Sequence, residues 1–370
     1  MIKPEELPID CKFYLKPEGF IPSGSACHAA RRLASGWMAF TALRVIVRVE
    51  GRRVLEKLVP TDDFEAYLHH FLMPHREKLL VLLNALVSAR PAMEWDGLSL
   101  MWDRPRVMGI LNVTPDSFSD GGLFSSTNMA MTYARDMIAA GVDIIDVGGE
   151  STRPGAESVS TEDELARVLP VIDALSGEGC VLSIDTRQAA VMAEAVAHGA
   201  HMINDVNALE GDGAVDEAAK SGRPVVLMHA QGDPRTMQDA PAYGDVLLDV
   251  YDYLEARIAA CVAAGVAREA IIVDPGIGFG KTVGHNAALI EGLSIFHALG
   301  CPVMLGASRK SFIAKMSADE ASDQRIGGSL AAMMMGVQQG VQLYRVHDVA
   351  MSVQAAQVFV DVVKSADNNN

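Results

Sequence analysis

The sequence predicts an α/β protein whose larger part is a (β/α)8 TIM barrel, preceded by a small α+β N-terminal region. From about Arg106 onward, short apolar runs alternate with longer segments of helical period. Alternating strands and helices form parallel sheets, and eight such units within one domain length close into a barrel. Nearly every apolar run also ends in a polar side chain, as expected where an active site lines one rim. A doubly wound open sheet is the competing fold.

The predicted barrel elements follow from apolar periodicity. The strands are 107–111, 144–147, 181–184, 201–203, 225–228, 271–273, 303–305 and 343–346. The helices include 128–140, 162–175, 188–198, 246–263 and 324–339. A barrel of this kind needs about 250 residues. We therefore assign residues 93–370 to the barrel domain and residues 1–92 to a separate N-terminal extension.

Polar residues with useful chemistry follow the predicted strands. In chain order they are Asn112, the turn Gly148-Gly149-Glu150, Asp185, Asn204, His229, Asp274, Ser308-Arg309-Lys310, and Arg345 with His347. A single Asp or Asn at such a position is often only a helix cap. A nearly complete ring of polar residues is not explained by capping, and it predicts an active site at the C-terminal rim of the barrel.

Residues 1–92 show a different pattern, which predicts a small α+β region. Apolar segments at 45–49 and 54–59 flank Glu50-Gly51, a turn with glycine that is typical of a β-hairpin. Residues 62–88 are amphipathic and predict one helix. Residues 93–106 predict a short hairpin that plugs the bottom of the barrel.

The first 60 residues are basic, although the whole chain is acidic. They hold ten Lys or Arg and six Asp or Glu, a net charge of 10 − 6 = +4, whereas the chain carries −16. A solvated surface is the simplest interpretation. Docking against an acidic partner, or against the barrel itself, is the alternative.

The composition favours a soluble, cytoplasmic enzyme. Hydrophobic residues make up 49% of the chain, enough for a large core. The net charge of −16 argues against a nucleic-acid partner, because phosphate backbones attract an excess of Lys and Arg. The five cysteines form no C-x-x-C pair, which favours a reducing compartment over a disulfide framework or a zinc site. No apolar run approaches the roughly 18 residues of a membrane span, so we expect no membrane association.

Two loops after predicted strands are longer than a minimal βα turn. The first spans 112–122, and the second, 150–156, contains Thr152-Arg153-Pro154. Long loops on a barrel rim are commonly lids. An arginine on a loop flanked by Gly and Pro suits an anion clamp; taken alone, it would be a surface arginine.

These loops and several later motifs resemble the dihydropteroate synthase family. The motifs are N-V-T-P-D-S-F at 112–118, S-T-R-P-G at 151–155, S-I-D-T at 183–186, N-D-V at 204–206, D-P-G-I-G-F-G-K at 274–281, S-R-K at 308–310 and R-V-H-D at 345–348. They occur in family order over about residues 93–365. The resemblance implies a sulfonamide-target transferase of folate biosynthesis, which condenses 6-hydroxymethyl-7,8-dihydropterin diphosphate with p-aminobenzoate.

The resemblance implies a pterin site at Asp185, Asn204, Asp274, Lys310 and Met228. A pterin has a guanidine-like edge that pairs well with a carboxylate, and Asp274 would bind it. Asp185 and Asn204 would bind the ring nitrogens, and Lys310 the carbonyl side. Two buried carboxylates could instead perform acid–base catalysis, but the amide of Asn204 favours recognition.

The resemblance also implies a diphosphate site at Asn112, Arg153, Arg345 and His347. Preorganised donors there would stabilise the charge that develops on the leaving group. Asn112 is in addition the family's Mg2+ position, and an amide oxygen suits that ion. A capping or core role is the alternative for His347. We expect Lys310, Arg153, Arg345 and His347 to be the catalytic residues.

For p-aminobenzoate, the resemblance implies Thr152, Pro154, Phe279 and Ser308. Pro154 and Phe279 would contact the ring. Ser308, expected at a helix start, would hold the carboxylate with backbone N–H groups. Arg309 is expected to face away, and His229 to be structural. The spacing of 276–281 does not match a nucleotide-binding loop, so we interpret this glycine run as a tight turn against the substrate.

Two rival functions and the oligomeric state complete the predictions. A methyltransferase of the methyltetrahydrofolate type shares the pterin contacts but does not need the two loops or S-R-K. An inactive paralogue that binds another folate enzyme should have lost a site residue, whereas only Arg187 and Ala230 depart from the family pattern.

Residues 333–335 are all Met and cannot share one helix face. Core packing is the default for them, and a homodimer interface is the alternative that the family suggests.

Overall fold

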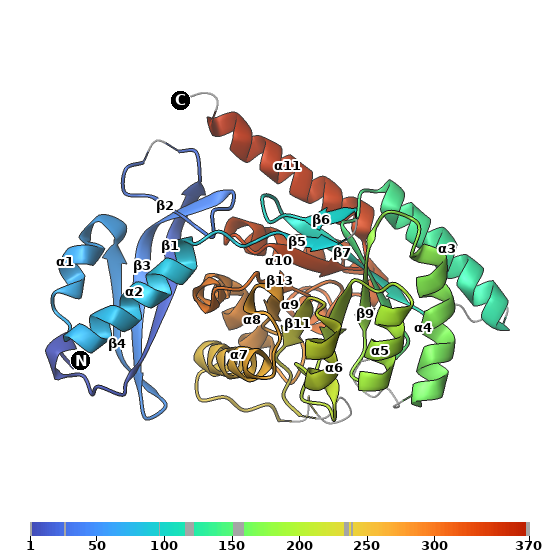
Figure 1. Cartoon of the computed structure of the whole chain (residues 1–370). Coiled ribbons are helices and arrows are strands. Elements are labelled where there is room, and N and C mark those ends of the chain that lie inside the picture. Colours follow the sequence, from blue (N-terminus) through green and yellow to red (C-terminus); the bar gives the residue numbers. More distant parts are fainter. Residues whose placement is uncertain are drawn as a thin grey trace.

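We analysed a computed structural model of the chain, which describes residues 2–25, 27–95, 97–114, 122–150, 159–232, 237 and 240–367. Of residues 122–126, 366 and 367 it describes the backbone alone. A large barrel carries the later part of the chain, and a smaller N-terminal sheet with two helices lies beside it (Figure 1).

Eight parallel strands form the barrel. They are β7 (Arg106–Asn112), β8 (Ile144–Gly148), β9 (Val181–Asp185), β10 (Met202–Asp205), β11 (Val225–Met228), β12 (Ile271–Asp274), β13 (Met304–Leu305) and β14 (Leu343–Val346). Their order is β12-β11-β10-β9-β8-β7-β14-β13. A parallel bridge between Val273 and Val303 joins the two ends. The predicted (β/α)8 TIM barrel is confirmed, and the ends of the predicted strands agree to within a residue, except that β10 ends two residues later than predicted.

Helices cover the outside of the barrel. They are α3 (Gly122–Ala139), α4 (Thr161–Leu175), α5 (Ala189–Ala197), α6 (Ala214–Ser221), α7 (Val246–Ala263), α8 (Val283–Glu291), α9 (Ser311–Met316), α10 (Ile326–Gln338) and α11 (Val349–Asp367). Short 3-10 turns are η1 (Pro4–Glu6), η2 (Thr61–Asp63), η4 (Arg268–Ala270), η5 (Leu293–Leu299) and η6 (Ser322–Gln324). The five predicted barrel helices are confirmed.

A hairpin of β5 (Met93–Trp95) and β6 (Leu98–Leu100) closes the bottom of the barrel, as predicted. Met93, Leu100 and Trp102 form one buried cluster with interior residues of all eight strands. The indole of Trp95 donates a hydrogen bond to the carbonyl of His201, 3.0 Å away. The bottom of the barrel interior is therefore a packed core.

The N-terminal region is a four-stranded antiparallel sheet with two helices. The strands are β1 (Lys12–Pro22), β2 (Arg31–Arg32), β3 (Met38–Val49) and β4 (Arg52–Pro60). The predicted hairpin is β3–β4, and its turn residues Glu50 and Gly51 have φ of 46° and 77°. The sequence did not reveal β1, because Pro17 argues against a strand. Since β1 pairs with β3 alone, it is an edge strand, where a proline is tolerated.

The single helix predicted at 62–88 is wrong. The structure has two helices there, α1 (Phe64–Leu68) and α2 (Met73–Val87). Pro74 lies in the first turn of α2, where its missing N–H costs no helical hydrogen bond. Leu72, just before α2, is extended (ψ 154°). The chain therefore turns between the two helices.

The N-terminal region packs mainly against η5 of the barrel, through β1 and α2, and β1 also contacts α11; α7, α8 and α10 lie on the same side of the barrel (Figure 1). One continuous hydrophobic cluster contains residues of its sheet and residues of the barrel helices. The indole of Trp37 donates to the carbonyl of Val337 (2.9 Å). The guanidinium of buried Arg90 donates to the carbonyls of His297 (2.8 Å) and Cys301 (3.2 Å). Such buried contacts between regions indicate a stable interface rather than a loose tether.

Candidate functional site

The alternate strands β8, β10, β12 and β14 place four polar side chains in one layer of the barrel. These are Asp146, Asn204, Asp274 and Arg345, respectively. Each follows by two residues an apolar residue of the plugged interior, namely Ile144, Met202, Ile272 and Leu343. Because side chains on one face of a strand recur every two residues, the polar layer lies directly above the apolar one, towards the C-terminal rim.

Arg345 joins two buried carboxylates in this layer. Its Nε lies 2.6 Å from Asp146 Oδ2, and its Nη2 lies 2.6 Å from Asp185 Oδ2. Asn204 Nδ2 donates to the same oxygen of Asp146, 2.9 Å away. Among the described residues, the other oxygen of Asp146, Oδ1, has no hydrogen-bond partner although it is buried. A ligand that donates a hydrogen bond could satisfy this oxygen.

Sequence reasoning missed Asp146. Its strand, residues 144–147, was interpreted as one apolar run, and only residues that follow strands were considered. Strands of a parallel sheet are covered on both faces and are normally apolar throughout. A charged residue inside such a run was therefore the available signal.

Asp274 and Lys310 are neighbouring charged side chains of the site, and Lys310 Nζ donates a hydrogen bond to the carbonyl of Ile277. A side chain at Gly306 would place its Cβ 3.5 Å from Asp274 Oδ2 and 3.8 Å from Lys310 Nζ, so both groups border the same small space. Burial raises the pKa of Asp274, and the nearby Lys310 opposes that shift. Burial also lowers the pKa of Lys310 to about 8, with Asp274 opposing it. The protonation of Lys310 therefore depends on how far burial and Asp274 offset each other.

The turn after β12 packs tightly, as the sequence predicted. Gly276, Gly278 and Gly280 all have positive φ, and a Cβ at Gly276 would lie 1.9 Å from the carbonyl oxygen of His229. The amide of Gly276 donates to Asp274 Oδ1 (2.7 Å). This turn brings Phe279 to Lys310, whose Nζ lies 4.4 Å from the ring centroid. Residues predicted to bind the two substrates thus meet here.

His229 and Lys281 support this turn from behind. Lys281 is 2% exposed, and its Nζ contacts His229 Nδ1 at 2.9 Å and the carbonyl of Phe279 at 3.0 Å. Burial, together with the charge of Lys281, lowers the pKa of His229 to about 3, so its imidazole is neutral and accepts from the lysine. Tyr243 donates to the carbonyl of Gly280 (2.8 Å). No local pattern in the sequence indicated these contacts.

Ser308 and His347 lie together on the other side of the rim. Ser308 Oγ accepts from the amide of His347 and contacts its Nδ1, both at 3.1 Å. The predicted helix start at Ser308 is wrong, because α9 begins at Ser311 with Lys310 as its N-cap. The intervening Arg309 has φ 56° and forms an ion pair with Asp348.

Asn112 lies at the end of β7, opposite Gly148 of β8. A Cβ at Gly148 would lie 3.6 Å from Asn112 Oδ1 and 3.7 Å from Asp185 Oδ2, so the glycine leaves the space between these oxygens open. Within the described ranges, no group of three or more His, Cys, Asp or Glu could hold a metal. The predicted residues Thr152, Arg153 and Pro154 lie outside the described residues.

The fold and the polar layer define a barrel enzyme that recognises a small polar ligand at its C-terminal rim. A family profile described as pterin binding enzyme matches residues 108–347. The dihydropteroate synthase of Escherichia coli K12 is 48% identical over 274 residues, which is 74% of this chain and 96% of that protein. The chain belongs to the pterin-binding enzymes and, among them, to the dihydropteroate synthase family.

Solved structures agree with this assignment. A Xanthomonas albilineans dihydropteroate synthase with 4-aminobenzoic acid is 46% identical, with a TM-score of 0.70, over 74% of this chain and 98% of that one. The same enzyme in complex with 7,8-dihydropteroate is 43% identical, with a TM-score of 0.67 and the same coverage. The methyltransferase alternative is thereby rejected. None of the helices in the described ranges has the length and apolar character needed to cross a bilayer.

Proposed function

We propose that this protein joins 6-hydroxymethyl-7,8-dihydropterin diphosphate to p-aminobenzoate, giving 7,8-dihydropteroate and diphosphate. The amine nitrogen of p-aminobenzoate bonds to the exocyclic methylene carbon of the pterin. The bond from that carbon to the diphosphate oxygen breaks, and the amine loses one proton. The observation that carries the proposal is the layer of buried Asp146, Asn204 and Asp274 with partly buried Arg345, in a chain that is 48% identical to a synthase over 274 residues.

The pterin is assigned to the buried layer. Asp274 accepts from the guanidine-like edge, and Lys310, beside it, donates to the carbonyl side. Asn204 and Asp185 bind the ring nitrogens, and Met228, which is 4% exposed at the end of β11, packs against the ring. Asp146 fits the same scheme, since a ligand N–H would complete its unpaired buried oxygen.

The diphosphate is assigned to the rim between β7 and β14. Asn112, Arg345 and His347 lie at the ends of these strands, and Arg153 would complete the set. Cationic donors there stabilise the charge that builds up on the departing oxygen. Arg345 would also connect the two substrate halves, because its guanidinium already holds Asp185.

The p-aminobenzoate is assigned to the space between Phe279 and Ser308. Phe279 offers a ring face near Lys310, and Ser308 offers a hydroxyl near His347. Thr152 and Pro154 are proposed to cover the aromatic ring.

We also propose that Mg2+ assists the departure of diphosphate. Asn112 Oδ1 faces the space kept open by Gly148, and amide, phosphate and water oxygens are the ligands that Mg2+ prefers. The ion would supply charge neutralisation on the diphosphate. Asn112 would hold it as one ligand among several from substrate and water.

The same proposal includes a homodimer in the cytoplasm. Met335 of α10 is 45% exposed and Met316 of α9 is 55% exposed, and both line a groove of about 430 Å³ between α8, α9 and α10. Met333 is buried in the core, whereas Met335 faces the groove, so residues 333–335 contact both the core and an exposed surface. All five cysteines are unpaired, as suits a reducing compartment.

The experiment that tests the function is release of diphosphate from the pterin substrate with and without p-aminobenzoate, and with and without Mg2+. We expect release to depend on both. Release that is unaffected by p-aminobenzoate would contradict transfer to the amine. No release in the presence of both would contradict the synthase proposal altogether.

A further inference from the structure

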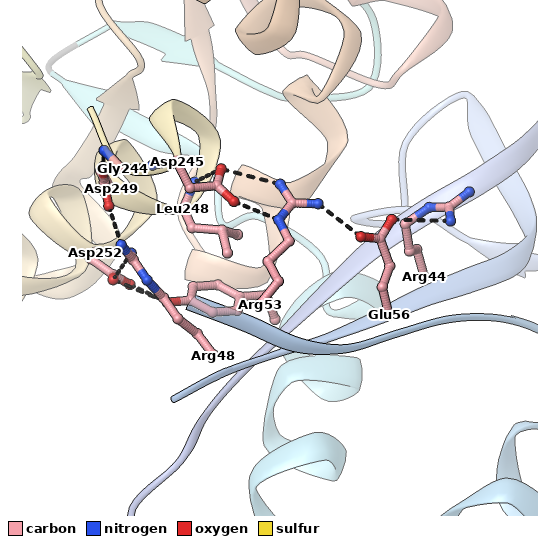
Figure 2. Close-up of polar contacts among 10 residues, drawn as sticks. Arg44, Arg48, Arg53, Glu56, Gly244, Asp245, Leu248, Asp249 and Asp252 are labelled. Atoms are coloured by element: carbon pink, nitrogen blue, oxygen red, sulfur yellow. Dashed lines mark hydrogen bonds and ion pairs between the residues drawn. The ribbon is translucent and has the colours of Figure 1, made fainter. Parts of the chain in front are cut away.

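The tip of the β3–β4 hairpin contacts the barrel at the catalytic face. Arg48 and Arg53 flank the turn Glu50-Gly51, and both reach the first turns of α7 (Figure 2). Helix α7 starts at Val246, after the loop that follows the C-terminal end of β11. In a barrel, such loops lie on the active-site side. The basic N-terminal region therefore docks on the barrel, and it does so next to the site.

Each arginine binds a carboxylate that already fixes the backbone of this loop. Arg53 binds Asp245 with two hydrogen bonds, Nε to Oδ2 at 2.5 Å and Nη2 to Oδ1 at 3.1 Å. Asp245 is the N-cap of α7, and its Oδ1 accepts from the amide of Leu248. Arg48 Nη2 lies 2.5 Å from Asp249 Oδ1. The other oxygen of Asp249 accepts from the amides of Gly244 (2.9 Å) and Asp245 (3.0 Å).

These ion pairs are partly shielded from water. In the Arg48–Asp249 pair the side chains are 14% and 26% exposed, and in the Arg53–Asp245 pair they are 34% and 18% exposed. Burial alone would raise the pKa of Asp245, but the hydrogen bonds and charge of Arg53 lower it. Two-point arginine–carboxylate pairs with limited solvent access fix geometry better than exposed single contacts do.

Residues 243–245, fixed in this way, contact the glycine turn 276–280 in their turn. Tyr243 immediately precedes the segment whose amides bind Asp249, and its hydroxyl donates to the carbonyl of Gly280. Gly280 follows Phe279, whose ring lies under the ammonium of Lys310. One chain of contacts thus runs from Arg53 through Asp245 and Tyr243 to the residue assigned to p-aminobenzoate.

We propose that Arg53 and Arg48 are positioning residues for the synthase reaction, through which the N-terminal region sets the orientation of Tyr243 and the turn 276–280. This inference rests on the proposed function. The N-terminal region is then part of the active-site support, in addition to being a packing surface. The contact acts mainly on the p-aminobenzoate half of the site, because Tyr243 bonds next to Phe279.

Steady-state kinetics of the full-length variants test the inference. We expect Arg53→Ala to raise KM for p-aminobenzoate about 3- to 10-fold, with kcat changed less than about twofold, as is typical of residues that act through a contact network. Asp245→Asn should give the same shift, because it keeps the N-cap acceptor but loses the charge pair. Arg53→Lys keeps the positive charge, so its KM for p-aminobenzoate should lie between those of the wild type and Arg53→Ala.

Lys16→Ala is the matched control. It also removes an ion pair between the two regions, with Glu291 (2.7 Å), but that pair lies at the C-terminal end of α8. We expect its KM to equal that of the wild type even if its melting temperature falls. Equal KM shifts in Lys16→Ala and Arg53→Ala would overturn the proposal, since general loosening would then explain both.

A double variant tests the path through Tyr243. If Arg53 acts through the tyrosine hydroxyl, the double variant Arg53→Ala/Tyr243→Phe should have a KM for p-aminobenzoate no higher than that of the more strongly affected single variant. Multiplied effects, or an Arg53→Ala enzyme with wild-type KM, would overturn the inference while leaving the synthase function intact. If instead the wild-type protein forms no 7,8-dihydropteroate, the proposed function itself is contradicted.

Discussion

At the scale of single residues, the site contains more buried carboxylates than positive charges. Arg345 is shared by Asp146 and Asp185, while Lys310 serves Asp274. Burial, together with the neighbouring Asp146, raises the pKa of Asp185 against the pull of Arg345. An uncharged ring that donates hydrogen bonds adds no further negative charge here, so the ring part of a pterin diphosphate suits the layer.

Lys310→Ala should abolish turnover and leave the fold intact. The change removes the only donor assigned to the pterin carbonyl side, while its neighbours Phe312 and Ile313 keep α9 packed. Product formation and circular dichroism check the two parts of this prediction. Exposed Lys315 on the same helix supplies the control Lys315→Ala, which should retain activity. Full activity in Lys310→Ala would refute the assignment of the pterin site.

Asp146→Asn should lower kcat/KM for the pterin substrate by about 10- to 100-fold, the effect of losing one charged partner in a buried pair. The substitution keeps the size of the side chain but leaves Arg345 with a single carboxylate. Pre-steady-state and steady-state rates with the pterin diphosphate would measure this loss of kcat/KM. Wild-type kinetics would mean that Asp146 only fills space.

At the scale of elements, the turn after β12 is the part of the site with the least freedom. A Cβ at Gly276 would meet the carbonyl of His229 at 1.9 Å, and the residue has φ 69°. Gly276→Ala should therefore cost about 2–4 kcal/mol of folding free energy, the sum of backbone strain and a steric clash. Chemical unfolding measures this. Gly177→Ala, where the added Cβ meets nothing within 4 Å, should be nearly neutral; equal losses would contradict the close-packed turn.

The 3-10 element η5 carries a buried neutral histidine that makes stability depend on pH. Burial, and then the charge of Arg90, lower the pKa of His297 to about 3. In the unfolded chain its pKa is about 6.5. The unfolded state then binds the extra proton between these values, so this contribution to stability is lost as pH falls below about 6.5.

His297→Gln tests that linkage. Between pH 6 and pH 4, the free energy of unfolding of the wild type should fall relative to the variant by up to about 1.4 kcal/mol per pH unit. The comparison cancels the buried His229, which both proteins contain. Denaturant titrations at several pH values give the measurement. Parallel pH profiles would show that His297 is protonated without penalty.

Elements were predictable where one physical rule decides them. The barrel strands are buried on both faces, so their apolar runs reveal them, as 225–228 and 343–346 show. Pro17 hid the edge strand β1. Site residues at or near the C-terminal ends of strands were found, whereas Asp146, in the middle of β8, was not. Contacts such as Tyr243 with Gly280 join distant segments and could not be read from local pattern.

At the scale of the whole molecule, the N-terminal region and the barrel share one hydrophobic cluster. Leu33, Leu86 and Phe40 of the first region are almost fully buried, and the cluster continues into Phe296 and Val337 of the barrel. The family match begins only at residue 108. The N-terminal region therefore lies outside the family match, and the barrel uses it as a packing surface.

Deletion of residues 1–92 should yield a barrel that is less stable and prone to aggregate. The deletion exposes the apolar side of η5 and leaves Val337 without the indole of Trp37. Exposed apolar surfaces of this kind promote association. The test compares the soluble yield, light scattering and melting temperature of a fragment of residues 93–370 with those of the full chain. A soluble, equally stable fragment would show that the two regions fold independently.

The central claim is that the polar layer and its rim make this chain a synthase and not merely a pterin-binding barrel. The most direct measurement is mass-spectrometric identification of the product formed from the pterin diphosphate and p-aminobenzoate by wild-type enzyme and by Asp274→Asn. We predict 7,8-dihydropteroate in equal amount to the diphosphate released by the wild type, and a large loss of it in the variant. Diphosphate without dihydropteroate, or equal product from both proteins, would contradict the account.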